Sequence, residues 1–166
     1  MIPGVGVRTV LLVALLAALA ACARVTHREQ RTLLGPTALE IWTASVMLRT
    51  GREPTFDERH QWDSQMEARV SRYLSEHPEI SNSSEVSNFT YLRQVGVGMS
   101  KEHALLLLGP PLSTVTDGAE METLARAYWP AIKGGNVTEA WVYPLGWRLF
   151  FNGPRIVDIT QYLELY

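Results

Sequence analysis

Hydrophobic residues follow two different periods along this chain. Between residues 37 and 77 they recur every three or four positions, whereas after residue 139 they alternate with other residues. The first period is that of an amphipathic helix, and the second is that of a half-buried strand. The order of the two periods predicts an α+β fold, in which a helical hairpin and short helices pack on a small antiparallel sheet.

Two capping boxes predict the starts of two consecutive helices. Thr37 with Glu40, and Thr55 with Glu58, have the spacing at which each side chain satisfies an exposed backbone N–H of the other residue. The apolar positions that follow are Leu39, Trp42 and Val46 in the first helix, and Trp62, Met66, Val70, Tyr73 and Leu74 in the second.

The ends of these two helices are also marked. Gly51 is a suitable stop for the first helix. The second is expected to end near His77, because Pro78 disfavours the helical conformation in the residue before it. Residues 37–80 are therefore predicted to form a helical hairpin.

The middle of the chain predicts short elements separated by loops. Residues 81–84 suit a loop or a cap, and residues 85–95 suit either a short helix or a strand. Ser100 is expected to cap a short helix that Gly109 ends. Another helix is expected before Pro130, which would stop it. Its apolar positions are Met121, Leu124, Ala125 and Tyr128.

The last part of the chain predicts a strand followed by a β-hairpin. The expected strands cover residues 139–143, 147–151 and 155–160. Apolar runs on both sides of Asn152-Gly153 are typical of a hairpin. The register stays open. A three-residue loop would place Arg148 opposite Asp158, but Pro154 cannot adopt the positive φ that such a loop often needs.

Composition and charge narrow the class of protein only a little. The chain has 166 residues, of which 46% are hydrophobic and 19% charged, with a formal net charge of −2. This length suits one domain. The values exclude a chain that its charge keeps disordered throughout, and a nucleic-acid binder that works through excess positive charge.

The first residues have the pattern of an export signal. Arg8 is the only charged residue before Arg24, and an apolar run covers residues 10–21. About 20 apolar residues are needed to span a bilayer, so the run predicts a cleaved signal peptide at residues 1–21 and not a membrane helix.

Residues 19–22, Leu-Ala-Ala-Cys, resemble the lipobox of bacterial lipoproteins, and Cys22 is the only cysteine of the chain. The resemblance implies that the Cys22 thiol carries lipid and that this residue becomes the mature N-terminus. Ala23, in place of an aspartate, favours the periplasmic side of the outer membrane. Residues 22–36 lack a clear period and are predicted to be a tether. The alternative is a plain secretory signal beside an incidental thiol.

Residues 95–159 resemble the SmpA/OmlA-like, or BamE-like, small outer-membrane lipoproteins. The motifs that carry the resemblance are Gly98-Met99-Ser100, Leu108-Gly109-Pro110-Pro111, Trp141-Val142-Tyr143 and Phe150-Phe151-Asn152-Gly153. The resemblance implies helices on one face of the sheet in an α+β domain at residues 81–166. It also implies an accessory role in outer-membrane β-barrel assembly. Residues 37–77 have no counterpart in the family pattern and residues 117–137 are longer than it, so this role is an analogy.

We find no catalytic constellation in the sequence. The histidines at positions 27, 60, 77 and 103 lack a metal-binding spacing and are expected at the surface or at helix caps. Gly96-Val97-Gly98 lacks the further residues of a phosphate-binding loop and predicts a turn. We therefore predict no enzymatic activity, no cofactor and no metal.

The sequence thus predicts a membrane-anchored envelope lipoprotein that binds another envelope protein and no nucleic acid. Most of the five tryptophans are expected in the core, and one or two are candidates for an exposed aromatic patch. One alternative is an inhibitor or binding module for a soluble enzyme, acting through the concave sheet face as β-lactamase inhibitor proteins of similar fold do. Another, an envelope enzyme, would need a deep pocket with converging polar groups.

Overall fold

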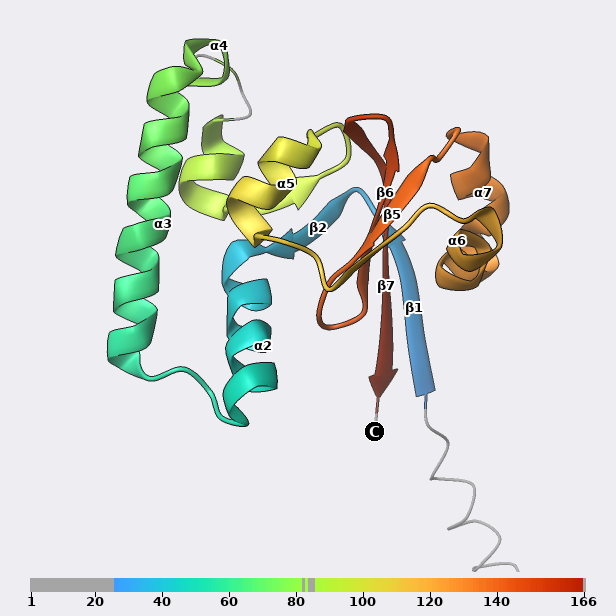
Figure 1. Cartoon of the computed structure of the whole chain (residues 1–166), viewed down its shortest axis with the longest axis horizontal. Helices are drawn as coiled ribbons and strands as arrows, with labels where there is room; N and C mark the ends of the chain where they lie inside the picture. Colours follow the sequence, from blue (N-terminus) through green and yellow to red (C-terminus); the bar gives the residue numbers. More distant parts are fainter. Residues whose placement is uncertain (1–25, 82, 84–85, 166) are drawn as a thin grey trace, which may run out of the picture. The chain divides into compact units, whose positions relative to one another are not determined.

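The computed structural model describes residues 26–81, 83 and 86–165 (Figure 1). Cys22 and the predicted signal peptide lie outside these residues. By its internal contacts the chain divides into one unit of Met1–Arg28 with Glu164–Tyr166 and a second unit of Glu29–Leu163. Among the described residues, the second unit contains the helices and nearly all of the sheet residues.

The described residues have an α+β fold with a five-stranded and a two-stranded sheet. The larger sheet contains β1 (Thr26–Thr32), β4 (Ser113–Val115), β5 (Glu139–Val142), β6 (Trp147–Asn152) and β7 (Arg155–Leu165). Its order is β1-β7-β6-β5-β4, so the first strand of the chain lies beside the last. The smaller sheet pairs β2 (Leu34–Thr37) with β3 (Gln94–Gly96) in antiparallel fashion.

The predicted helix starts and stops are confirmed for the N-terminal helices. The helical elements are α2 (Ala38–Thr50), α3 (Phe56–Glu76), α4 (Pro78–Ser81), a π-helix η1 (Asn88–Leu92), α5 (Lys101–Leu108), α6 (Gly118–Ala125), a 3-10 helix η2 (Arg126–Tyr128) and α7 (Trp129–Gly134). Both capping boxes form, with Thr37 before α2 and Thr55 before α3. Gly51, at φ 71°, ends α2, and His77 ends α3.

The predicted tether is wrong for residues 26–36, which form β1 and most of β2. Polar side chains hold β1 against β7. Gln30 Nε2 donates to Gln161 Oε1 at 2.7 Å, and the Arg31 guanidinium lies 2.8 Å from the Asp158 carboxylate. A strand at the edge of a sheet that is held by such pairs shows little hydrophobic alternation, and the sequence pattern therefore missed it.

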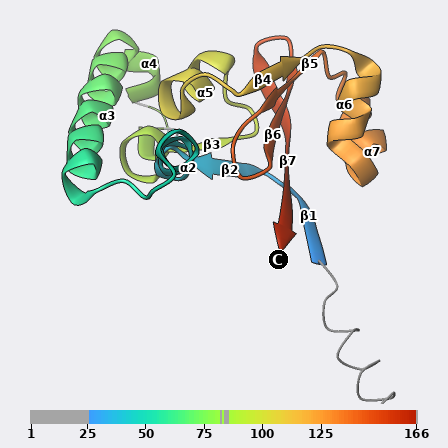
Figure 2. The same cartoon turned by 60° about the horizontal axis from the view of Figure 1, so that its bottom comes forward.

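Side chains pack on both faces of the larger sheet, which corrects the expectation of helices on one face only. Trp141, Leu149 and Phe151 belong to a core shared with α2, α3 and α5. Ala140 and Phe150 point to the opposite face, since successive strand residues alternate, and they pack with α6 and α7. Figure 2 shows α6 and α7 on one side of the sheet and α2, α3 and α5 on the other.

One core joins the predicted helical hairpin to the domain expected after residue 81. Ile41 of α2 and Met66 of α3 are 2% and 1% exposed and belong to the same cluster as Leu149 of β6. The α2 and α3 helices therefore depend on the sheet for their burial and share its core.

The hairpin register is settled by a two-residue turn of Gly153 and Pro154. Gly153 has φ 55°, and Pro154 follows it at the position where its fixed negative φ fits. Together with a register shift inside the hairpin, the turn places Arg148 opposite Thr160 and not opposite Asp158.

Two further local predictions are decided by the structure. Pro130 does not stop a helix. It lies in the first turn of α7, where the missing N–H of proline has no helical partner to lose. In the segment 85–95, whose type was left open, the described residues form η1 and then β3, so both alternatives hold in part.

Candidate functional site

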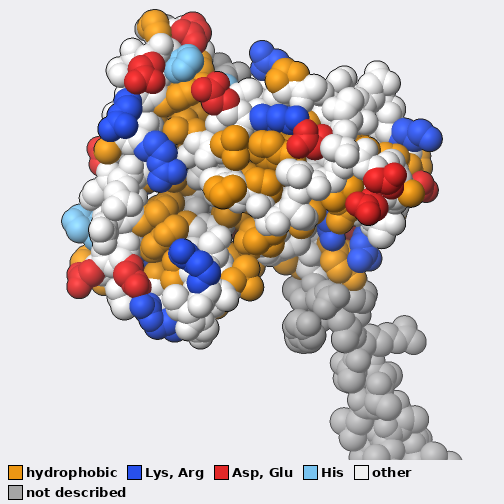
Figure 3. All heavy atoms as spheres, viewed as in Figure 1, with side chains coloured by type: hydrophobic (Ala, Val, Ile, Leu, Met, Phe, Trp, Pro, Cys, Tyr) orange, Lys and Arg blue, Asp and Glu red, His pale blue; other side chains and the backbone are white. Residues whose placement is uncertain are grey.

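A stacked pair of tryptophans links the two N-terminal helices. The ring centroids of Trp42 in α2 and Trp62 in α3 are 4.9 Å apart, with 20° between the ring planes. Both residues belong to the apolar positions that the sequence predicted. Figure 3 shows hydrophobic side chains at the surface on the side of α2 and α3, with Lys and Arg side chains among them. We take the surface around this pair as the candidate site.

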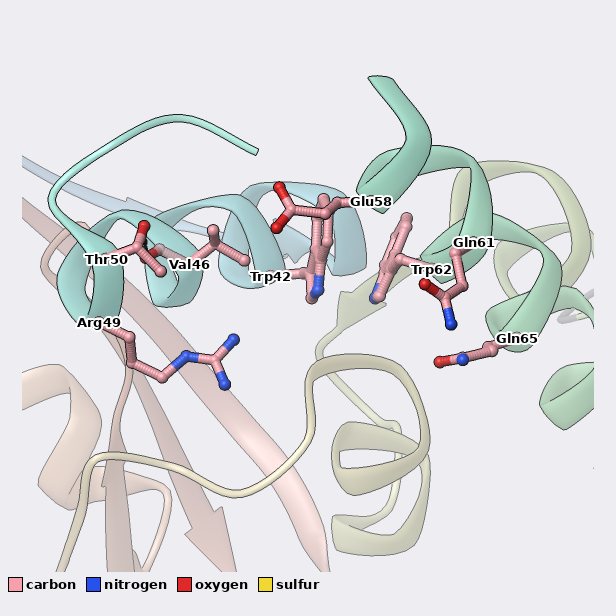
Figure 4. A pocket seen from close by; sticks show the side chains of 8 residues that line it. All are labelled: Trp42, Val46, Arg49, Thr50, Glu58, Gln61, Trp62 and Gln65. Carbon is pink, nitrogen blue, oxygen red and sulfur yellow. Dashed lines mark hydrogen bonds between the residues drawn. The ribbon is translucent and has the colours of Figure 1, made fainter. Parts of the chain in front are cut away.

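A groove with a cavity volume of about 380 Å³ lies beside the tryptophan pair, and we call it the tryptophan groove (Figure 4). Its lining residues are Trp42, Val46, Arg49 and Thr50 from α2 and Glu58, Gln61, Trp62 and Gln65 from α3. The groove therefore combines two aromatic rings with one carboxylate, one guanidinium and two amides.

The negative charge of Glu58, the carboxylate of the groove, is already balanced by a neighbouring arginine. Arg52 donates two hydrogen bonds of 2.8 Å to Glu58, one to each carboxylate oxygen. The backbone N–H of Thr55 donates a third, also of 2.8 Å. The hydrogen bonds from Arg52 are the largest cause that lowers the pKa of Glu58 to about 2. Glu58 is therefore ionised at neutral pH, where its carboxylate is paired with Arg52.

The other polar groups of the groove offer hydrogen-bond donors. Arg49 Nε donates to the Ser45 carbonyl at 3.1 Å, which holds the guanidinium along α2. In Figure 4 this guanidinium and the Gln65 side chain extend toward each other from the two helices. In the described part of the chain, the indole N–H groups of Trp42 and Trp62 and the side-chain amide of Gln65 form no hydrogen bonds.

Four apolar side chains are exposed around Trp62 outside the groove, and we call them the apolar rim. They are Leu39, Phe56, Tyr91 and Leu92, with exposed fractions of 39%, 81%, 81% and 53%. Two hollows connect them, because both are lined by Leu39, Trp62 and Asp63. A contiguous exposed apolar surface in a folded protein often marks a binding site.

An ion pair and a backbone hydrogen bond hold the rim in place. The Arg93 guanidinium pairs with Asp63, which joins the end of η1 to α3. Arg93 also accepts a 2.7 Å hydrogen bond at its carbonyl from the N–H of Ala38, the first residue of α2. These contacts connect α2, α3 and η1 beneath the exposed side chains. The rim side chains are therefore held together on one ordered surface.

The predicted surface or cap positions are confirmed for His60, His77 and His103, and the side chain of His27 is outside the part of the chain that the structure describes. His60 is exposed and stacks with Phe56, with ring centroids 6.4 Å apart. His77 stands at the end of α3 beside Glu79, as expected for a cap. His103 does cap α5, since its Nδ1 accepts from the Ser100 N–H. It is buried, 8% exposed, with its ring against Phe89, so of the two expected positions His103 takes the cap and not the surface.

The expectation that most tryptophans lie in the core is confirmed, whereas none of the five is exposed enough to form the expected surface patch by itself. Trp62, Trp141 and Trp147 are buried, whereas Trp42 and Trp129 are partly buried. The sequence did not single out Phe56 or Tyr91. Phe56 is the first residue of α3 and does not follow the apolar spacing of that helix. This departure from the spacing was the one sequence signal that could have indicated its exposure.

Comparisons with family models, curated proteins and solved structures find no match. The resemblance of residues 95–159 to the SmpA/OmlA-like lipoproteins therefore stays a prediction that its motifs carry. Across residues 26–81, 83 and 86–165, no helix is long and apolar enough to cross a membrane. The same residues contain no group of three His, Cys, Asp or Glu side chains placed to hold a metal ion.

Proposed function

We propose that this chain is a non-enzymatic lipoprotein that binds another envelope protein and is held on the periplasmic side of the outer membrane by lipid on Cys22. The observation that carries the binding role is the apolar rim. The lipobox sequence at residues 19–22 supports the anchor. The motifs of residues 95–159 support a BamE-like arrangement and make the β-barrel assembly machinery the first candidate partner.

The energetics of the rim favour a protein partner. Phe56 and Tyr91 each expose most of a large side chain to water. Burial of apolar surface yields about 25 cal/mol per Å², and aromatic anchors surrounded by polar groups dominate many protein interfaces. The Asp63–Arg93 pair beside the rim supplies such polar groups.

A lipid anchor would keep this surface at the membrane without a basic patch. Each buried methylene contributes about 0.8 kcal/mol, and one acyl chain alone holds a protein only marginally. A mature lipoprotein carries two or three chains, which makes its attachment effectively permanent. The net charge of −2 gives the whole chain no general attraction to anionic lipid.

The alternative function, inhibition of a soluble enzyme through the sheet face, would need exposed aromatic side chains on that face. Phe150 on one face and Phe151 on the other are both 0% exposed. Helices cover both faces of the sheet. We therefore favour binding through the helical side of the molecule.

Replacement of the lipobox cysteine tests the anchor. In a Gram-negative host, Cys22→Ser is expected to abolish the acylated mature form, because a hydroxyl cannot take the thioether-linked diacylglyceryl group. Mass spectrometry of the N-terminal peptide checks this together with membrane fractionation. If the serine variant still sediments with membranes at the processed mass of the parent, the anchor is disproved.

Photo-crosslinking in cells tests the docking surface. A photoreactive residue at position 56 or 91 is expected to capture the same envelope protein. The same residue at Leu112, which is 62% exposed but outside the rim, is the matched control and is expected to capture little of it. Phe56→Asp should reduce capture from position 91 about tenfold, within the range for loss of an aromatic anchor. Equal capture from position 112 contradicts the proposal, and capture of a soluble enzyme alone supports the alternative.

A further inference from the structure

The polar lining of the tryptophan groove indicates what the partner presents there. Trp62 lines the groove and also both hollows between the side chains of the apolar rim, so one partner segment that covers the rim also reaches the groove. We infer that the groove binds an acidic segment of the partner, with an Asp or Glu carboxylate placed between apolar side chains. This inference rests on the proposed function, because it concerns the same docking surface.

The charge balance of the groove favours a carboxylate. Its lining includes one cation, Arg49, and one anion, Glu58, and both oxygens of that anion already accept hydrogen bonds from Arg52. The described residues give Arg49 no ion pair of its own. A guanidinium binds a carboxylate through two parallel hydrogen bonds, which are stronger than neutral ones. A basic partner segment would instead meet Arg49 with no available carboxylate.

The face of α3 beside the groove continues this positive character. Arg69 follows Gln65 by four positions and therefore lies on the same side of the helix. Arg72 falls on this side as well, since it follows Arg69 by three positions. Both are exposed, and the structure assigns neither an ion pair within its described ranges. Two further cations thus lie along α3 beyond the Gln65 end of the groove.

The apolar walls add strength and selectivity. Trp42, Val46 and Trp62 are the apolar part of the lining that Arg49 shares, and a bound partner segment would displace water from it. A charge-assisted hydrogen bond is stronger where the local dielectric is lower. The indole N–H groups at the border of the groove are donors only, which again suits carboxylate or carbonyl oxygens.

Charge reversal combined with crosslinking from the rim tests this inference. In the full chain with a photoreactive residue at position 56, Arg49→Glu is expected to lower the yield of the crosslinked partner more than about tenfold, because it places a like charge against the partner carboxylate. Arg49→Lys should lower it less, because it keeps the charge but loses the paired hydrogen bonds. Lys133→Glu is the matched control, since Lys133 is exposed on α7 and undergoes the same charge change. It should leave the yield within twofold.

The crosslinked peptide identifies the chemistry directly. With the photoreactive residue moved to position 61, mass spectrometry is expected to locate the adduct on a partner segment that contains Asp or Glu. An adduct on a neutral or basic segment, on a lipid, or an Arg49→Glu yield equal to that of Lys133→Glu overturns the inference. If the partner is still captured from position 56, the proposed function survives that result. If nothing is captured from position 56 in the parent chain, the proposed function itself fails.

Discussion

Gly146→Ala is expected to leave most of the protein unfolded. A Cβ at this position would lie 1.8 Å from the carbonyl oxygen of Tyr162 and 2.8 Å from its carbonyl carbon. The contact is with backbone, and the N–H of Tyr162 donates a 3.0 Å hydrogen bond to the Gly146 carbonyl, so neither strand can move aside without breaking the pairing. The expected cost is above about 5 kcal/mol, which reaches the whole unfolding free energy of a marginally stable domain.

Gly51→Ala is the matched control for this substitution. Gly51 and Gly146 have nearly the same φ, 71° and 72°, but a Cβ at Gly51 would meet nothing within 4 Å. The control therefore carries only the cost of a left-handed residue, roughly 1–2 kcal/mol. Urea denaturation followed by circular dichroism measures both variants. If both substitutions lower the free energy of unfolding equally, the backbone of Tyr162 in β7 does not lie close to Gly146.

The elements that the sequence predicted well are those defined by local signals. Thr37 and Thr55 form their capping boxes with residues three positions away, and Ser100 caps α5 in the same way. Asn152-Gly153 likewise produced the expected hairpin. Each signal is a short-range interaction, and it does not depend on what the rest of the chain does.

The elements that sequence reasoning missed depend on distant partners. Arg31 and Asp158 are far apart in the chain, and their ion pair contributes to the pairing of β1 with β7. The sequence around Arg31 contains no pattern that indicates a contact with Asp158. The same holds for Pro130, whose position at the start of α7 follows from the packing of Ile132 and Ala125 on the second sheet face.

The candidate site was predictable only in part for the same reason. Trp42 and Trp62 stand at helical spacing, and their burial was expected. The exposure of Phe56 and Tyr91 could not be read from the sequence, because it depends on how η1 and α3 meet at the Arg93–Asp63 pair. The charge of the groove depends on Glu58 being paired with Arg52, a contact made across the loop between two helices.

Phe150→Ala and Phe151→Ala are expected to damage different halves of the protein. Both side chains are 0% exposed, so each truncation should cost about 3–5 kcal/mol. Phe150 packs with Met121 and Ile132 under α6 and α7, whereas Phe151 lies against Trp141, with ring centroids 4.6 Å apart, in the core shared with α3. Chemical denaturation measures the total loss, and Phe150→Leu, which retains most of the volume, should cost less than about 1.5 kcal/mol.

Amide hydrogen exchange separates the two effects, because sub-global opening frees the amides of the element that loses its contacts. Phe150→Ala should speed exchange in α6 and α7 and leave the middle of α3 nearly unchanged. Phe151→Ala should speed exchange around Met66 and Val70 of α3, which belong to its cluster. If both variants accelerate the same amides, the two faces of the sheet do not support separate cores. The burial of α6 and α7 on the second face would then need another explanation.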